Sequence, residues 1–445
     1  MYANEQAKPG PVVANQAAVQ PGPPAAKYND VIWAILFAVN VAAVVVAAVL
    51  NFKNIHLQDS SSSNATPDKE STAIIAGLAV GFVGSVAFGL GWVRVLNHPR
   101  ISSNLIKFAM FANVALMLVA GVASLAAGAV GAGVIFIVFG LLGAVWYYFV
   151  RNRIEFTTIM LEMATTCIKQ YGASVYVAFF MQVVSIVWAV VWTVAVLGAA
   201  GANSGIVAFL LILSLYWTSN VLMNVVQVIA GGVAATWYYQ SQTRNVTSAS
   251  AKRALTTSFG SICYGSFIVS LIETLRVLAR SMSRDHWVMA CIIDCILGCI
   301  QAIAQFITKY AYAYVAIWGQ DFCSAAKNTW ELLQRRGLDV IVNDDMSGLA
   351  FWLSALIGGV AGAVIGGVVY AGVGGHGNAA PVMILCFFLG AFLTGVVMSV
   401  LEACVVTFMV LWAEEPAALA THHPALHQKL VAAVRRIYPS VGLAV

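Results

Sequence analysis

The sequence predicts an all-α membrane protein that crosses the bilayer about ten times. Of its 445 residues, 61% are hydrophobic and only 9% are charged, whereas a soluble domain carries about 25% charged residues. The apolar residues form long uninterrupted runs, without the alternation of barrel strands. A soluble fold of this size could not keep so much apolar surface from water. The lipid bilayer is therefore the expected surrounding of most of the chain.

Ten stretches are long enough to span the membrane, because a helix needs about 20 apolar residues to cross a hydrocarbon core of about 30 Å. They cover residues 31–52, 73–96, 105–127, 129–150, 174–200, 205–228, 259–280, 287–318, 349–373 and 381–412. Residues 31–412 are thus one predicted transmembrane domain. Residues 1–30 lack the apolar core of a signal peptide and are predicted to be a disordered tail. Residues 413–445 are predicted to be a second tail.

Lysine and arginine decide the orientation, since they accumulate on the cytosolic side. With the N-terminus inside, eighteen of these residues fall in inner segments and five in outer ones. Both termini are therefore predicted to be cytosolic. The first outer loop contains a glycosylation sequon at Asn64. Because the basic residues are spread over short loops, the net charge of +5 does not indicate a nucleic-acid partner.

The cysteines and histidines do not indicate a metal site. Cys291, Cys295 and Cys299 recur every four residues but have no histidine nearby, so helix packing explains them better. His423 and His427 lie in the C-terminal tail without partner cysteines. The chain also lacks a phosphate-binding loop and a nucleophile elbow in its proper context. We therefore expect no cofactor, no metal and no enzymatic activity.

Small residues recur every four positions in two of the predicted spans. Such rows let helix backbones approach closely, which is how helices associate in lipid. Tight packing is the first interpretation, and a seam that slides during transport is the alternative. The rows are Gly77, Gly81, Ser85 and Gly89 in the second span, and Gly358, Gly362 and Gly366 in the ninth.

Two carboxylates are predicted to lie inside the membrane. Glu273 is about 14 residues into the seventh span, about 20 Å from the inner face, and Asp294 is about 10 Å deep in the next span. A membrane carboxylate must face a partner or a wet cavity. Either both are structural, as pairs Glu273–Arg276 and Asp294–Arg280, or they line a cavity for a cation.

Aromatic residues are predicted at similar depths. Trp188 lies in the fifth span, and Tyr216 and Trp217 lie in the sixth. Aromatic faces and a carboxylate suit a quaternary ammonium, which binds through cation–π attraction and charge. The predicted substrate site is therefore Asp294, Glu273, Trp188, Tyr216 and Trp217, with ordinary packing as the alternative for each aromatic residue.

A second polar group is predicted near the inner face. Glu402 lies about 20 residues into the tenth span, and Tyr310, Tyr314 and Trp318 lie at the inner end of the eighth. These four residues are the predicted inner gate. An interfacial aromatic belt is the alternative for the aromatic ones.

Three blocks resemble the choline transporter-like family, solute carrier group 44, and its fungal and protist pH-nine-sensitive branch. They are "FGSICYGSFIVSLIETLRVL" (259–278), "YAYAYVAIWGQDFCSAAKNTWELLQRRGLDVIVND" (310–344) and "EACVVTFMVLWAEEPAALATHHP" (402–424). The resemblance implies ten helices, cytosolic termini, and a role in moving choline or related amines across the plasma membrane.

These observations together predict a multi-pass plasma-membrane transporter of a small organic cation, most simply choline. Its expected partners are that cation and the lipid bilayer. A passive channel and a membrane scaffold without a substrate are the alternatives. A channel would give flux that does not saturate, and a scaffold would give no uptake.

Overall fold

The structure is a computed structural model that describes residues 27–52, 69–199, 205–239, 244–282, 287–375 and 377–437. Asn64 and most of the predicted N-terminal tail lie outside these residues. The described chain forms helices and no strand: α1 (Val31–Phe52), α2 (Lys69–Leu96), α3 (Pro99–Ala126), α4 (Val130–Val150), the 3-10 turn η1 (Arg151–Arg153), α5 (Ile154–Gln170), α6 (Ala173–Ala199), α7 (Gly205–Tyr239), α8 (Val246–Leu255), α9 (Phe259–Met282), α10 (Trp287–Trp318), α11 (Phe322–Gly372), α12 (Ala380–Glu414), α13 (Pro416–His422) and α14 (Pro424–Ile437).

The prediction of an all-α polytopic membrane protein is confirmed. Within the described residues, nine helical segments are long and apolar enough to cross a membrane. The remaining predicted span is α10, which has 32 residues and so measures about 48 Å. It carries the polar residues Asp294, Gln301, Gln305 and Lys309 and packs against α7, α9, α11 and α12.

Two helices are clearly longer than predicted: α7 continues past its predicted end at 228 to Tyr239, and α11 begins well before its predicted span of 349–373. α11 has 51 residues and a break at Arg336, where φ is −138° and ψ is 25°. Its first part is amphipathic and buries Phe322 and Leu332, so hydropathy alone does not reveal it. The helix starts at Asp321, whose carboxylate accepts a hydrogen bond of 3.0 Å from the Ser324 backbone N–H. That N–H holds the pKa of Asp321 below its usual value.

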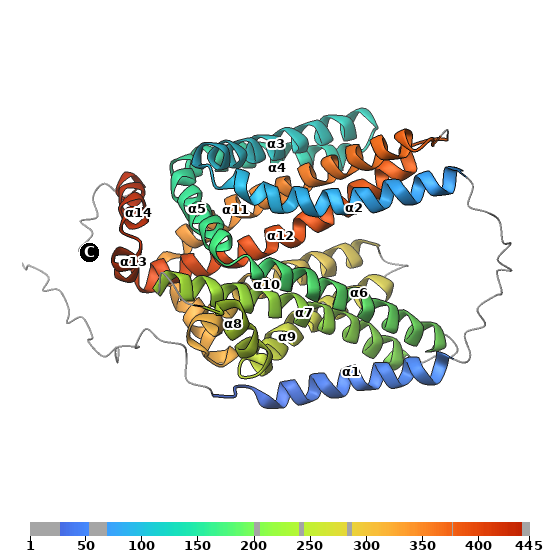
Figure 1. The fold of residues 1–445 in the computed structure, drawn as a ribbon, viewed down its shortest axis with the longest axis horizontal. Coiled ribbons are helices and arrows are strands. Elements are labelled where there is room, and N and C mark those ends of the chain that lie inside the picture. The colour runs from blue at the N-terminus through green and yellow to red at the C-terminus, as the bar shows by residue number, and fades with distance from the viewer. Residues whose placement is uncertain are drawn as a thin grey trace, which may run out of the picture.

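The long helices run side by side, and the short helices α5, α8, α13 and α14 gather at one end (Figure 1). α1 begins at this end, and the described C-terminal helix α14 lies there too. The loops at this end hold most of the basic residues, which the positive-inside rule assigns to the cytosol. We call it the cytosolic end.

α12 is the centre of the bundle, because it contacts α2 and α11 on one side and α7 and α10 on the other. The packing predicted from the glycine rows is confirmed there. A Cβ at Gly77 would lie 3.0 Å from the Gly366 carbonyl oxygen, and one at Gly81 would lie 2.8 Å from the Cys386 sulfur. A side chain at these positions would force α2, α11 and α12 apart.

The helices of the C-terminal segment are held against the cytosolic end. His423 stacks on Trp237 with ring centroids 3.9 Å apart, and the Tyr238 hydroxyl donates to the Glu415 carbonyl at 3.1 Å. Glu415 and His423 flank α13, so these contacts hold both ends of α13 against the last turn of α7. α14 packs on α5, whose Met160 and Met163 are fully buried. Helix α5 therefore links α14 to the transmembrane bundle.

Candidate functional site

A cavity of about 710 Å³ lies between α6, α7, α9, α10 and α12. This volume falls within the range of small-molecule sites. Phe392 is the one aromatic residue among the side chains that line it, whereas Met181 and Met223 give it further soft apolar surface. Its polar lining consists of Gln182, Ser185, Ser219, Asn220, Asn224, Gln227, Gln305, Thr308, Lys309, Ser399 and Glu402.

An ionic cluster lies at the cavity, with Lys309 and Glu402 in its lining and Asp344 behind them. The Lys309 ammonium of α10 lies 2.5 Å from a Glu402 carboxylate oxygen of α12 and 2.6 Å from an Asp344 oxygen of α11. The Glu402 side chain is 35% exposed, against 21% for Lys309 and 20% for Asp344. Glu402 is thus the carboxylate of this cluster that is most open to a ligand.

The Glu273 carboxylate lies beside the same cavity and is held by amides. Asn220 donates to it at 2.9 Å, Gln305 at 3.1 Å and Gln301 at 3.2 Å. Asn220 and Gln305 also line the cavity. The predicted structural pair of Glu273 with Arg276 does not form in the structure. The Glu273 carboxylate therefore lies close to the cavity without a basic partner among the described residues.

Asp294 is placed elsewhere. Arg276 contacts its two oxygens at 2.6 and 3.2 Å, and Arg280 does so at 2.7 and 2.9 Å. Both arginines belong to α9, so this arginine clamp joins α9 to α10. Asp294 does not line the cavity. The structural alternative for Asp294 fits this geometry, with Arg276 added to the predicted Arg280.

The three aromatic residues of the predicted substrate site are not gathered around the cavity either. Trp188 is 7% exposed and packs in a cluster with Val44 and Ala48 of α1. Trp217 is buried, and its indole N–H donates to the Cys263 carbonyl at 3.0 Å. Tyr216 is half-buried outside the cavity lining. A role of these rings in binding substrate stays a prediction, without support from the geometry.

The residues of the predicted inner gate lie in two layers, the first at the cavity itself and the second nearer the cytosolic end. In the first, the Tyr310 hydroxyl donates to Asp344 at 3.4 Å, next to the Lys309–Glu402 pair. The second layer begins with Tyr314, four residues after Tyr310 along α10 and about 6 Å on. There the Tyr314 hydroxyl donates to Glu414 at 2.7 Å.

The second layer also contains a salt bridge and a ring contact. Arg335 of α11 lies 2.8 Å from the same oxygen of Glu414, at the end of α12. Trp318 packs on Tyr314 with centroids 5.1 Å apart. These contacts join α10, α11 and α12, and they cross the end of the bundle where a gate to the cytosol would have to lie.

Sequence reasoning assigned no role to Lys309, Asp344 and Gln305 beyond the basic-residue count and the family blocks. A lysine in an apolar helix is itself a signal, because an intramembrane ion needs a partner. Asp344, however, lies before the predicted span of 349–373, and only the continuous helix α11 places it at membrane depth. Gln305 resembles any other polar residue of α10 until its contact with Glu273 is known.

The arrangement can hold a cation and can exchange it. Among the described residues, Glu402 and Lys309 line the cavity, and two further carboxylates lie behind this lining: Asp344 in contact with Lys309, and Glu273 in contact with Asn220 and Gln305. Membrane carboxylates that are not neutralised by basic residues attract a cation. Residues 134–417 match the family model described as plasma-membrane choline transporter. The chain belongs to the choline transporter-like family.

Relatives of this choline transporter-like protein cover nearly its whole length. A CTL-like protein of Dictyostelium discoideum is 30% identical over 93% of this chain and 76% of its own. Protein PNS1 of Eremothecium gossypii is 26% identical over 93% of this chain and 82% of its own. Protein PNS1 of Cryptococcus neoformans is 29% identical over 94% and 83%. The resemblance to the fungal and protist branch is thereby confirmed.

Proposed function

We propose that this transporter-family protein carries a small organic cation, choline or a related amine, across the plasma membrane through the central cavity. The observation that carries the proposal is the group of three carboxylates, Glu402 in the cavity lining and Asp344 and Glu273 behind it, against the single ammonium of Lys309 among the described residues. A small organic cation fits within about 710 Å³ and would offset part of this negative charge.

In this proposal Glu402 is the principal contact of the cation. A quaternary ammonium cannot donate a hydrogen bond, so a carboxylate attracts it by charge and apolar groups contact its methyl groups. Met181, Met223 and Phe392 supply such groups in the cavity lining. The amides that hold Glu273 would take hydrogen bonds from a hydroxyl on the same substrate.

The Lys309 ammonium competes with the substrate cation for the Glu402 carboxylate. This ammonium lies almost equally close to Glu402 and Asp344, so a small shift toward Asp344 would free Glu402 for the substrate. When the substrate leaves, Lys309 would return and neutralise the site. This exchange fits alternating access or facilitated diffusion, with the Tyr314–Glu414–Arg335 layer as the closure toward the cytosol.

Uptake of radiolabelled choline into a transport-deficient cell tests the proposal, with ethanolamine, carnitine and polyamines as competitors. We expect saturable uptake that at least one of these amines inhibits. Protein that reaches the surface without uptake or competition would contradict the organic-cation assignment and favour a scaffold. Flux that rises linearly with choline would favour a passive channel.

A further inference from the structure

A second cavity, of about 850 Å³, opens at the cytosolic end, away from the central one. It lies where α3 begins, where α4 turns through η1 into α5, and where α14 lies across α5. Arg100, Lys107, Arg151 and Arg436 line it, and we call this group the basic pocket. Glu155 is the one acidic side chain among the lining residues.

The charges of the basic pocket are not balanced by carboxylates in the part of the chain that the structure describes. Glu155 pairs with Arg436 at 2.5 Å. Arg100, Lys107 and Arg151 have no carboxylate partner among the described residues. The four basic groups and the one carboxylate leave a formal charge of +3 at the pocket. A multiply charged anion fits this excess better than a monovalent one.

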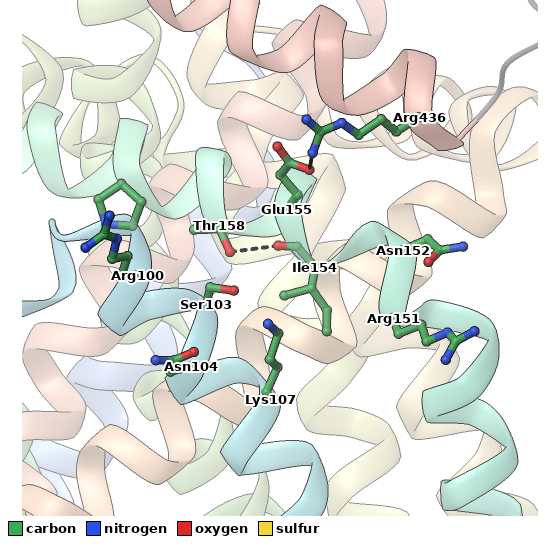
Figure 2. A pocket seen from close by; sticks show the side chains of 11 residues that line it. Arg100, Ser103, Asn104, Lys107, Arg151, Asn152, Ile154, Glu155, Thr158 and Arg436 are labelled. Atoms are coloured by element: carbon green, nitrogen blue, oxygen red, sulfur yellow. Dashed lines mark hydrogen bonds and ion pairs between the residues drawn. The ribbon is translucent and has the colours of Figure 1, made fainter.

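Neutral hydrogen-bonding groups lie among these charges. Ser103 and Asn104, from the first turns of α3, also line the pocket. Figure 2 shows Lys107 and Ser103 reaching from α3 toward Ile154 of α5, with Arg436 entering from α14 on the opposite side. Hydroxyl and amide groups next to Lys and Arg are the usual donors to phosphate oxygens.

The surface beside the basic pocket is apolar and open to lipid. Phe108 and Phe111 of α3 are 61% and 55% exposed, and Tyr148 and Phe149 of α4 are 62% and 69% exposed. The Arg151 guanidinium lies 4.5 Å from the centre of the Tyr148 ring, so the charged and apolar surfaces meet there. A ligand at this place can put a charged group in the pocket and an apolar chain along α3 and α4.

We propose that the basic pocket binds the phosphorylated headgroup of an anionic phospholipid of the cytosolic leaflet. Basic pockets at the cytosolic ends of membrane helices suit multiply phosphorylated headgroups. The phosphate groups lie at Lys107 and Ser103, with Arg100 and Arg151 on the two sides of the pocket (Figure 2), and the acyl chains lie along the exposed aromatic residues. Because Arg436 belongs to α14, the bound headgroup also fixes the C-terminal helix against α5. This site is independent of the proposed cation transport.

Native mass spectrometry of the purified full chain in detergent tests the inference. The protein is titrated with phosphatidylinositol 4,5-bisphosphate, with phosphatidylserine, and with soluble inositol trisphosphate. Each basic group near a membrane surface contributes about a fivefold gain in affinity. The double variant Arg100→Gln with Lys107→Gln should therefore bind the bisphosphate lipid about thirtyfold more weakly. Both side chains are exposed, so the double variant should keep the thermal midpoint of the lipid-free protein.

The matched control is Arg244→Gln with Lys327→Gln, which removes two exposed basic groups of the cytosolic end outside the pocket. We expect this control to bind the bisphosphate lipid as the parent does. Equal binding by the pocket variant, or an equal loss in the control, would overturn the site. If inositol trisphosphate binds as tightly as the lipid, the ligand is a free phosphate compound and the lipid assignment is wrong.

Discussion

Replacement of Glu402 by glutamine tests the charge argument most directly, because it keeps the shape of the side chain and removes its charge. A cation about 5 Å from a carboxylate gains about 3 kcal/mol at an effective dielectric constant of about 20. Lys309 lies 2.5 Å from Glu402 and 2.6 Å from Asp344, so we expect it to neutralise about half of the Glu402 charge. The attraction that Glu402→Gln removes is then about 1.5 kcal/mol, which corresponds to about a tenfold higher KM for choline.

The measurement is the concentration dependence of initial choline uptake, normalised to protein at the cell surface. Lys309→Gln should act in the opposite direction and lower KM, because it removes the competing ammonium from Glu402. Glu70→Gln is the control, since it removes one exposed carboxylate at the start of α2, away from the cavity. An unchanged KM in Glu402→Gln at normal surface yield would refute the assignment of Glu402 as the cation contact.

Three further predictions follow from the packing and the gate. Asp294→Asn should lower the thermal midpoint, because it removes the negative charge that pairs with the two arginines of the clamp. KM for choline should stay within about twofold. A large rise in KM in well-folded protein would indicate that Asp294 contacts the substrate. Gly358→Ala would press a methyl group into Thr394 and should cost about 1–3 kcal/mol of folding free energy, measured as a lower thermal midpoint. Gly91→Ala, with open space around it, should leave the thermal midpoint unchanged. Equal stability of the two glycine variants would contradict the packing argument. Tyr314→Phe removes the hydrogen bond to the last turn of α12 and should raise choline efflux from preloaded cells about fivefold, and unchanged efflux would exclude this layer as a gate.

Most of the membrane topology could be predicted from the sequence. The length of an apolar run can be read locally, and the bilayer thickness sets the length that a spanning helix needs. The predicted and observed limits of α1 are the same, and those of α4 and α12 differ by one or two residues. The break at Arg336 was not predictable in this way. It depends on how an amphipathic segment packs against the rest of the bundle. The mean hydropathy of a segment does not show which of its faces is apolar, so it does not reveal this packing.

The candidate site was predicted only in part. Glu273 and Glu402 do lie at or beside a cavity, as intramembrane carboxylates should, but Asp294 lies in a clamp with two arginines. Depth along a helix assigned Glu273 and Asp294 alike to the predicted substrate site and Glu402 to the predicted inner gate. The rotation of each helix about its own axis decides which of them faces the cavity, and this rotation is set by neighbours far away in the sequence.

The sequence by itself determined that this protein is a helical, multi-pass membrane protein, and its motifs placed it in a transporter family. Composition and run length suffice for this, because lipid imposes the same simple requirement on every span. Only the tertiary structure decided that Lys309 joins Glu402 to Asp344, and that Arg100, Lys107 and Arg151 have no carboxylate partner among the described residues. Pairing of charges depends on distances of a few ångströms between separate helices, and no local pattern in the chain records those distances.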